Sequence, residues 1–384
     1  MPQTLADKLK QSGVTSNTSK RKEPLWKGPE TADKEGGITF SLLSRFIVCP
    51  ERFRIYAIEG LKPRDQFNHR MEYGNMWHIC EEHKDNNWDT PLLDYAKQLV
   101  TKYPTSGEDI DKWYNVCKIQ FPIYMDYWSK HPDMTNRTPL LNEEKFKVPY
   151  TLPSGRIVYL RGKWDQVDLV KERNQQYVWL QENKAKGNVN PIQLQKQLSF
   201  DLQVMMYVIA LTKSSEGYRW RTLFSTNGDS KFGGVRYNVI KRPLSSGSGN
   251  TNIRQKQPTK SNPLGESKSS YFTRLKGIID GTGGEDVLGP DNFFYRWNIV
   301  ISQKDIDTFC KTCLDPLLEY VSVWYNCVTN NGKESLSKEY IHYRRPYGVY
   351  DILAQGGTSD YDEYLSSGIE IGLEQATTLF PELQ

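Results

Sequence analysis

Three stretches between residues 143 and 184 alternate apolar and polar residues, and this period of two constrains the fold more than any other feature. They read EEKFKVPYTL, GRIVYLRGKWDQVDLV and QYVWLQENK. Turn-forming residues separate them, at 153–155 and at 171–174. Alternating stretches divided by short turns are typical of consecutive antiparallel strands. The chain is therefore expected to be built around a sheet that contains this meander.

Helical spacing flanks the predicted strands. Ser41 is the expected N-cap of the first helix, which a Cys49-Pro50 step interrupts. Segments with apolar residues at every third or fourth position lie at 41–56, 69–86, 92–103, 111–130, 193–213 and 305–326. Further extended segments are expected at 220–226, 232–243 and 293–302. The alternation of helices and strands indicates an α/β fold.

Both ends of the chain and one internal segment differ in composition from the rest. Residues 1–37 are rich in Lys, Ser, Thr, Gly and Pro, and a loosely held tail is expected there. Residues 38–350 are expected to form one domain with a flexible basic insertion at 244–270. Seven Lys or Arg residues and one acid lie from Lys241 to Arg274, whereas residues 351–384 form an acidic tail with seven acids.

The overall charge and the apolar runs limit the class of protein. The net charge of +4 permits a nucleic-acid partner but does not require one. No apolar run approaches the roughly 20 residues that span a bilayer, and the first residues lack the apolar stretch of a secretory signal. We therefore expect a cytoplasmic protein without membrane contact, whose six cysteines are reduced.

The third strand ends on an acid and a base, Glu182 and Lys184. Side chains alternate along a strand, so both share a face with Val178 and Leu180. A carboxylate on a buried face is costly unless it is paired or binds a metal. From these residues alone, an ion pair along the strand edge remains the simplest interpretation.

Asp165 on the neighbouring strand adds a second carboxylate. Two carboxylates on adjacent strands can bind a hard cation such as Mg²⁺ or Mn²⁺. Such a cation lowers the pKa of a bound water and neutralises charge on a phosphate. Lys184 would then orient the water or stabilise the transition state.

These residues also carry a resemblance to a known family. Gly162-Lys163-Trp164-Asp165 followed by Glu182-Asn183-Lys184 resembles the PD-(D/E)XK nuclease signature, and most closely its RecB-like branch. That branch includes CRISPR-associated exonucleases and the nuclease domains of AddAB. Three further motifs match it: GNMWH ending at His78, QVMMY from Gln203 to Tyr207, and the opening SLLSRFIVCPERFRIY helix.

The resemblance implies a restriction-endonuclease-like core, in which helices flank a mixed sheet and further helices decorate both ends. It implies that His78, Asp165, Glu182 and the Asn183 backbone carbonyl bind Mg²⁺ or Mn²⁺. It also implies catalytic roles for Asp165, Glu182 and three further residues: Lys184, Gln203 and Tyr207. Without the resemblance, His78 would be interpreted as a core histidine, and Gln203 and Tyr207 as polar groups on a packed helix. Gly74, one turn before His78, is expected to allow close approach of another element.

The implied activity is metal-dependent hydrolysis of DNA, most simply from a free end, during replication, recombination or repair in a phage or prokaryote. A nucleic-acid-binding or assembly module with little catalysis is the alternative, and a nuclease acting on RNA is a third. Candidate DNA contacts are Lys186, Lys241, Arg242, Arg254, Lys256 and Lys260. Lys186 is equally interpreted as a solvated turn lysine, and the basic insertion as an inert loop. The acidic tail could bind a replication or recombination protein. The sequence does not indicate an oligomeric state.

Several RecB-like nucleases carry a 4Fe-4S cluster, with one ligand from the opening helix and three from a compact C-terminal group. Cys49 matches the first position. Cys310 and Cys313 lie inside an amphipathic helix, and Cys327 follows at a distance. The stretch HYRRPYGVYDILAQGG contains no cysteine. We therefore expect no cluster, with one built from Cys49, Cys310, Cys313 and Cys327 as the minority alternative.

Overall fold

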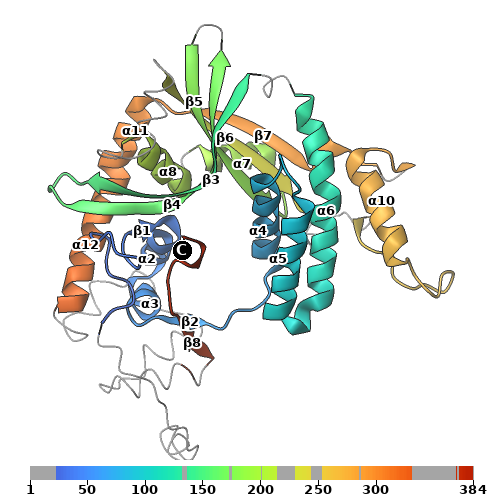
Figure 1. The fold of residues 1–384 in the computed structure, drawn as a ribbon, viewed down its shortest axis with the longest axis horizontal. Helices are drawn as coiled ribbons and strands as arrows, with labels where there is room; N and C mark the ends of the chain where they lie inside the picture. Colours follow the sequence, from blue (N-terminus) through green and yellow to red (C-terminus); the bar gives the residue numbers. More distant parts are fainter. Residues whose placement is uncertain are drawn as a thin grey trace, which may run out of the picture. The chain divides into compact units, whose positions relative to one another are not determined.

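The computed structural model describes residues 23–131, 136–172, 175–199, 201–213, 230–243, 253–284, 287–330, 369 and 372–383 (Figure 1). The strand expected at 220–226, the first part of the basic insertion and most of the acidic tail lie outside these residues. The chain divides into two compact units. The first comprises residues 1–65, 154–159 and 317–384, and the second comprises residues 66–153 and 160–316.

The second unit is built on a mixed sheet. Its strands are β3 (Arg137–Thr151), β4 (Ile157–Glu172), β5 (Gln175–Lys186), β6 (Lys231–Lys241) and β7 (Phe294–Val300). The order is β4-β5-β6-β7, and β3 also pairs with β4. The β4–β5 and β6–β7 pairs are antiparallel, whereas β5 and β6 are parallel. The three consecutive strands expected from the alternating pattern are thus confirmed, and the sheet is mixed as expected.

A parallel pair requires a crossover connection, and two helices lie in the chain between β5 and β6. These are α7 (Pro191–Leu198) and α8 (Leu202–Thr212). A single helix was expected here, but α7 ends at Leu198 and a second helix begins at Leu202. The side chain of Asp201, the N-cap of α8, accepts a hydrogen bond from the Val204 N–H. Aspartate is favoured at this N-cap position because it satisfies a free amide of the first turn. The Trp164 indole donates to the Tyr207 carbonyl at 3.2 Å and ties α8 to β4.

The helices expected before the meander pack together in the second unit (Figure 1). They are α4 (His69–Glu82), α5 (Asp89–Lys102) and α6 (Gly107–Ser129), with η2 (Pro104–Ser106) between α5 and α6. Trp77 is fully buried and makes edge contacts with Phe121 and Tyr124, at centroid distances of 5.3 and 5.1 Å. Large aromatic side chains contribute much of the buried apolar area in such a core. Helix α10 (Lys268–Asp280) packs against α6.

The described part of the basic insertion differs from the flexible loop that its composition predicts. The Glu266 carboxylate accepts hydrogen bonds from the Lys256 N–H at 2.9 Å and from the Arg274 guanidinium at 2.7 Å. Ile253 is buried in the core that contains α10. One acid among basic residues therefore anchors residues 253–267, a pairing that composition alone does not reveal.

The long helix expected at 305–326 is confirmed as three consecutive helical segments. They are α11 (Gln303–Phe309), the π-helical turn η7 (Cys310–Leu314) and α12 (Asp315–Asn330), preceded by η6 (Pro290–Asn292). Cys310 and Cys313 both lie in the π-helical turn. Most of α12 belongs to the first unit.

The first unit contains β1 (Ile38–Thr39), α2 (Phe40–Val48), α3 (Pro50–Phe53), η1 (Arg54–Ile58), β2 (Leu61–Pro63), β8 (Leu373–Gln375) and η9 (Pro381–Leu383). Strands β2 and β8 pair antiparallel, and β1 pairs with β4, whose first residues belong to this unit. The N-cap of helix α2 lies two residues earlier than expected. Thr39, and not Ser41, is its N-cap, since its hydroxyl accepts from the Leu42 N–H at 3.2 Å.

Residues 23–37 do not form the loose tail expected from their composition. Trp26 is fully buried and lies 5.3 Å from Phe53 and 5.2 Å from Tyr325, measured between ring centroids. Its indole donates to the Gly37 carbonyl at 2.7 Å. Leu25 is buried as well, and the Leu25 and Trp26 N–H groups donate to the carbonyls of residues 58 and 57. Buried apolar side chains and backbone hydrogen bonds thus hold a segment that is polar as a whole.

Candidate active site

Glu182 and Lys184, near the end of β5, form a buried pair in the second unit. The Lys184 ammonium donates to the Glu182 carboxylate at 2.6 Å, and Glu182 is 2% exposed. Val178 and Leu180 on the same face are fully buried, as the alternation predicts. Burial acts to lower the pKa of Lys184, but the Glu182 charge and hydrogen bond outweigh it and raise that pKa. The ammonium is therefore charged at neutral pH.

Asp165 lies where β4 and β5 separate. Their antiparallel register ends at the pair Gln166 and Gln181. Beyond this pair, the Asn183 N–H donates to the Asp165 carboxylate at 2.6 Å instead of to a backbone carbonyl of β4. A hydrogen bond to a side chain thus takes the place of a backbone hydrogen bond between β4 and β5 and fixes the distance between the two strands at this point. It also brings Asp165 close enough to Glu182 for their charges to interact.

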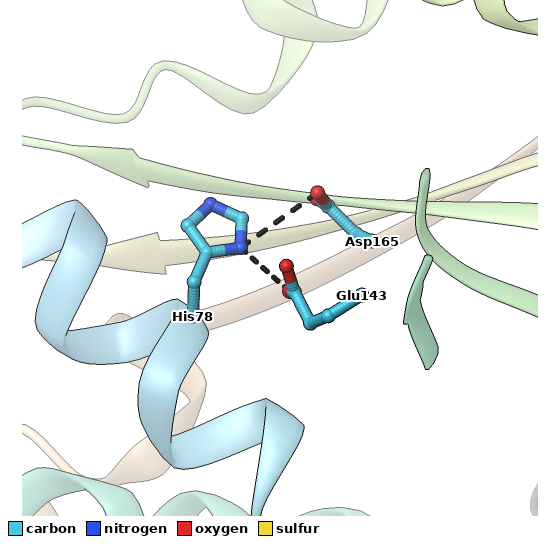
Figure 2. Close-up of side chains that lie close together, drawn as sticks. All are labelled: His78, Glu143 and Asp165. Atoms are coloured by element: carbon cyan, nitrogen blue, oxygen red, sulfur yellow. Dashed lines mark hydrogen bonds and ion pairs between the residues drawn. The ribbon is translucent and has the colours of Figure 1, made fainter. Parts of the chain in front are cut away.

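Three side chains converge beside this point: His78 from α4, Glu143 from β3 and Asp165 from β4 (Figure 2). The His78 Nδ1 atom lies 2.9 Å from a Glu143 oxygen and 3.7 Å from an Asp165 oxygen. One ligand atom from each residue lies within 4.8 Å of the others. Such an imidazole and carboxylate set matches the ligands that divalent cations take in proteins.

Glu143 was missed in the sequence. It reads there as one polar residue in an alternating strand, next to Glu144. In the structure its side chain is 1% exposed and its backbone has a φ of +50°, which is uncommon for a residue other than glycine. Strained backbone of this kind clusters at functional sites. No sequence pattern that we used predicts a positive φ at a glutamate.

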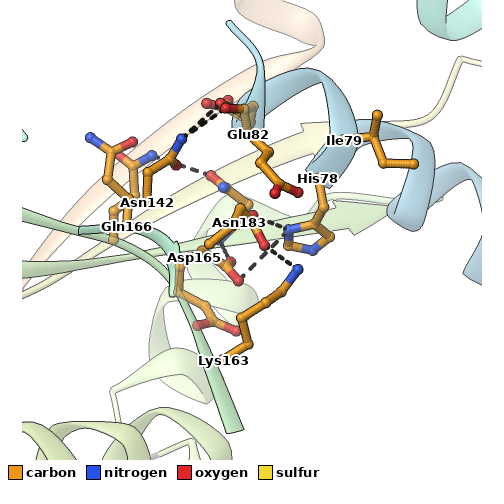
Figure 3. Close-up of polar contacts among 12 residues, drawn as sticks. His78, Ile79, Glu82, Asn142, Lys163, Asp165, Gln166 and Asn183 are labelled. Carbon is orange, nitrogen blue, oxygen red and sulfur yellow. Dashed lines mark hydrogen bonds and ion pairs between the residues drawn. The ribbon is translucent and has the colours of Figure 1, made fainter. Parts of the chain in front are cut away.

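Lys163 lies beside His78 and Asp165 (Figure 3), and it balances the negative charge of Glu143. Its ammonium pairs with the second Glu143 oxygen, while His78 binds the first. Burial acts to raise the pKa of Glu143, but the hydrogen bond from His78 and the two positive charges lower it. Lys163 comes from the Gly162-Lys163-Trp164-Asp165 motif, which therefore supplies both a candidate ligand and a countercharge.

Proton affinities at the site are shifted strongly. Burial and then the neighbouring Glu182 charge raise the pKa of Asp165 to about 8. Burial opposes the charged form of His78, but the Asp165 charge and the Glu143 hydrogen bond outweigh it and raise that pKa to about 9. The cause is the crowding of carboxylates in a dry environment, which favours any bound cation, whether a proton or a metal ion.

Gln203 and Tyr207 extend the site from α8. The Gln203 side chain accepts from the Lys184 ammonium at 2.7 Å and donates to the Tyr207 hydroxyl at 3.4 Å. Gly162 allows this helix to approach β4, because a Cβ there would lie 2.8 Å from the Tyr207 ring. The structure thus brings Gln203 onto Lys184, and Tyr207 follows one turn later.

One expectation about the His78 motif is wrong. Gly74 was expected to permit close approach of another element, but a Cβ at this position would meet no described atom within 4 Å. The glycine has no steric reason to be there among the described residues. The helix would accept alanine at this position and gain helix propensity.

The candidate DNA contacts fall into two groups. Lys186 lies near Lys184 and Arg242, whose positive charges add to burial in lowering its pKa. Arg242 is 6% exposed and donates to the Arg70 carbonyl at 3.2 Å, and Lys241 precedes it at the end of β6. The second group lies exposed on the segment that Glu266 anchors, and it consists of Arg254, Lys256 and Lys260.

The cysteines named for an iron–sulfur cluster are divided between the two units. Cys49 is buried in the first unit and accepts a hydrogen bond from the Arg52 N–H at 3.4 Å. Cys327 also belongs to the first unit, whereas Cys310 and Cys313 belong to the second. Whether the chain holds a cluster stays a prediction.

The donor set itself fits a divalent cation. Glu182 is buried, and its Oε2 atom has no hydrogen-bond partner among the described residues. A buried carboxylate oxygen without a partner is costly, and a metal ion would satisfy it. His78, Glu143 and Asp165 thus form the group that could hold the ion, and Glu182 lies close enough to Asp165 for their charges to interact. Of these four residues, Asp165, Glu182 and His78 were expected and Glu143 was not.

Comparison with known proteins identifies the family. The family model described as the PD-(D/E)XK nuclease superfamily matches residues 38–281. No curated protein matches the chain. In the part of the chain that the structure describes, no helix has the length and apolar character needed to cross a membrane. The match covers most of the sheet and every candidate catalytic residue, and the chain belongs to the PD-(D/E)XK nuclease superfamily, whose members use divalent metal ions.

Proposed function

We propose that this metal-dependent nuclease hydrolyses phosphodiester bonds of DNA from a free end. The single observation that carries the proposal is the convergence of His78, Glu143 and Asp165 beside the buried Glu182–Lys184 pair. A buried group of like charges is costly, so it is retained where chemistry uses it. The RecB-like branch, with its exonucleases, remains the best guide to the mode of attack.

The metal would be Mg²⁺ or Mn²⁺, held by His78, Glu143, Asp165 and Glu182. The Asn183 carbonyl is a further candidate ligand. The N–H and C=O of one strand residue point toward the same neighbouring strand, and the Asn183 N–H already binds Asp165. When bound, such an ion activates a water molecule for attack and neutralises phosphate charge.

Lys184 would donate a hydrogen bond to the reacting groups, and the other residues of the site would hold Lys184 and Glu143 in place. The Lys184 ammonium is fixed between Glu182 and Gln203, at 2.6 and 2.7 Å, so its third proton is free to bind the attacking water or a phosphate oxygen. Gln203 and Tyr207 keep Lys184 in one position. Lys163 pairs with Glu143 and would hold this carboxylate in place.

The substrate would follow the cationic side of the site. Lys186 shares the face of Lys184 one residue pair further along β5, and the Lys241–Arg242 end of β6 lies beside it. Arg254, Lys256 and Lys260 would add phosphate contacts outside the site. We place this activity in replication, recombination or repair in the cytoplasm of a prokaryotic or phage-infected cell, with the acidic tail as a contact for a protein partner.

Incubation of end-labelled linear DNA, circular DNA and RNA with Mg²⁺ or Mn²⁺ tests the proposal. Linear DNA should be degraded and circular DNA left intact. Lys184→Ala should lose about 10²–10³-fold in rate, whereas Lys171→Ala, an exposed lysine at the end of β4, should retain it. Undiminished cleavage by Lys184→Ala contradicts the mechanism. Absence of cleavage with every substrate and metal supports a binding module, and cleavage of RNA alone supports an RNA-directed nuclease.

A further inference from the structure

The face of β5 opposite Glu182 and Lys184 carries a buried group of neutral polar side chains. The Asn238 amide on β6 donates to the Asn183 side-chain oxygen at 2.9 Å and lies 2.6 Å from the Tyr124 hydroxyl on α6. The Gln181 amide donates to the same Asn183 oxygen at 3.4 Å. All four side chains are at most 5% exposed. We call Asn183, Gln181, Asn238 and Tyr124 the Asn183 network.

Charged groups anchor this network at its Gln181 end. The Arg137 guanidinium donates to the Gln181 oxygen at 3.3 Å and pairs with Asp168 at 2.8 Å. The Gln166 amide donates to the other Asp168 oxygen at 2.6 Å. Each of these side chains is fixed by at least one charge-assisted bond, which is stronger and more directional than a bond between neutral groups.

The Tyr124 end is anchored as well. Burial and then the Glu81 carboxylate raise the pKa of Tyr124 well above its ordinary value, so the hydroxyl keeps its proton. Lys84 pairs with Glu81 at 3.4 Å and donates to Gln166 at 2.7 Å. The network therefore joins strands β4, β5 and β6 to helices α4 and α6 behind the site.

Stability alone does not explain this group. Apolar side chains of similar size would stabilise a buried layer at least as well, because a polar group in a core must recover its lost hydration. The network is also not saturated: the Asn183 Nδ2 and Asn238 Oδ1 atoms have no hydrogen-bond partner among the described residues. Buried hydrogen bonds that do not maximise stability are retained where they specify one arrangement.

The Asn183 network holds Asn183 in place, and Asn183 links β5 to Asp165 on β4. Asn183 lies between Glu182 and Lys184, and its N–H binds Asp165 at 2.6 Å. On the β4 side the backbone register has already ended at Gln181. On the β6 side the register continues and pairs Asn183 with Asn238. The side-chain bond from Asn238 therefore adds a second attachment at the point where β5 loses its first.

We propose that Asn238 and Tyr124 are positioning residues, which act through Asn183 to set the distance between Asp165 and the Glu182–Lys184 pair. The inference rests on the proposed function, because it assumes that Asp165 and Glu182 act together on one metal ion. Supporting groups behind metal ligands typically change metal affinity or activity by 10–100-fold when they are removed. The same range is expected here.

Tyr124→Phe and Asn238→Ala test the inference, with Tyr150→Phe as the matched control. Tyr150 is equally buried, and its hydroxyl donates to Asp315 at 2.6 Å. Each tyrosine variant removes one buried hydroxyl and leaves the ring. The measurements are kcat and KM on linear DNA, the Kd for Mn²⁺ by calorimetry, and the thermal midpoint without metal.

We expect Tyr124→Phe and Asn238→Ala to lower kcat by about tenfold or more and to raise the Kd for Mn²⁺ by a similar factor. KM for DNA should change by less than about twofold, since ground-state binding of the substrate is untouched. Tyr150→Phe should lose a comparable amount of thermal stability with unchanged kcat and Kd.

Three outcomes overturn the inference: wild-type kcat and Kd in both network variants, an equal loss in Tyr150→Phe, or a loss confined to the thermal midpoint. A network variant that does not fold while the other retains wild-type kinetics also counts against it, since only a stability role remains. Failure of the proposed function is distinguishable, because the wild-type protein itself would then neither bind Mn²⁺ nor cleave DNA.

Discussion

At residues 181–184, both faces of β5 carry polar side chains that are buried or partly buried, but the two faces differ in charge. One face carries the charged residues Glu182 and Lys184, and one Glu182 oxygen has no hydrogen-bond partner within the part of the chain that the structure describes. The other carries the neutral residues Gln181 and Asn183, which bind each other and neighbouring elements. Charge left partly uncompensated suits a site that must bind a cation and a phosphate. Neutral amides suit a layer that must hold one geometry at every pH.

Replacing the catalytic carboxylate should have the largest effect. Glu182→Gln keeps the shape but removes the charge, both for the metal and for Lys184. We expect a rate loss of about a thousandfold, equivalent to roughly 4 kcal/mol, measured on end-labelled DNA with Mn²⁺. Glu172→Gln, at the exposed end of β4, is the control and should match the wild type. Full activity in Glu182→Gln would exclude this face as the site.

The charged pair behind the sheet should affect stability more than chemistry. Asp168 is fully buried, and Asp168→Asn removes the negative charge that pairs with Arg137 at 2.8 Å. Such a loss costs about 3–5 kcal/mol of unfolding free energy, measured by urea denaturation. The double variant Asp168→Leu with Arg137→Met should recover most of it, because a buried ion pair is often no more stabilising than apolar residues. A double variant less stable than the single one would show that the pair itself stabilises the fold.

The first face was largely predictable from the sequence, and the second was not. The period of two placed Glu182 and Lys184 together, and the antiparallel turn placed Asp165 beside them. The same alternation leaves Gln181 and Asn183 on the opposite face, and it cannot show that α6 covers this side of the sheet. Polar residues on a doubly covered sheet look the same in sequence as polar residues in water.

Other differences have equally local causes. Glu143 escaped notice because its role depends on a positive φ that no alternating pattern contains. Trp26 and Leu25 are the buried hydrophobic side chains that hold the largely polar residues 23–37. Glu266 anchors part of the basic insertion by pairing with Arg274. In each case one or two side chains determine a local structure that the composition of the neighbouring residues does not predict.

Protons should compete with the metal at the first face. In the metal-free protein the pKa values of Asp165 and His78 are raised to about 8 and about 9, so both groups hold protons at neutral pH. Binding of a cation must release these protons, so the affinity for Mn²⁺ should rise as pH increases from 6 to 8. The expected gain is about tenfold per pH unit for each proton released, or roughly 1.4 kcal/mol. Calorimetry in buffers of different ionisation enthalpy measures both the affinity and the released protons. An affinity that stays constant over this range would contradict the raised values.

The smallest effect is expected from replacing Lys186, which should weaken DNA binding without changing the rate of the chemical step. Lys186 lies beyond Lys184 on β5, and burial and then the positive charge of Lys184 lower the pKa of Lys186. The two ammonium groups therefore repel each other. An anion that lies between them is the simplest relief of this repulsion. Lys186→Ala should therefore weaken DNA binding by about 1 kcal/mol and leave kcat unchanged, in contrast to Lys184→Ala. The slope of log Kd against log salt concentration should fall by roughly 0.7–0.9. Lys231→Ala, at the opposite end of the neighbouring strand, is the control and should leave the slope unchanged. An equal change in both variants would mean that Lys186 contributes only net charge, and a loss of kcat in Lys186→Ala would extend the catalytic group by one strand residue.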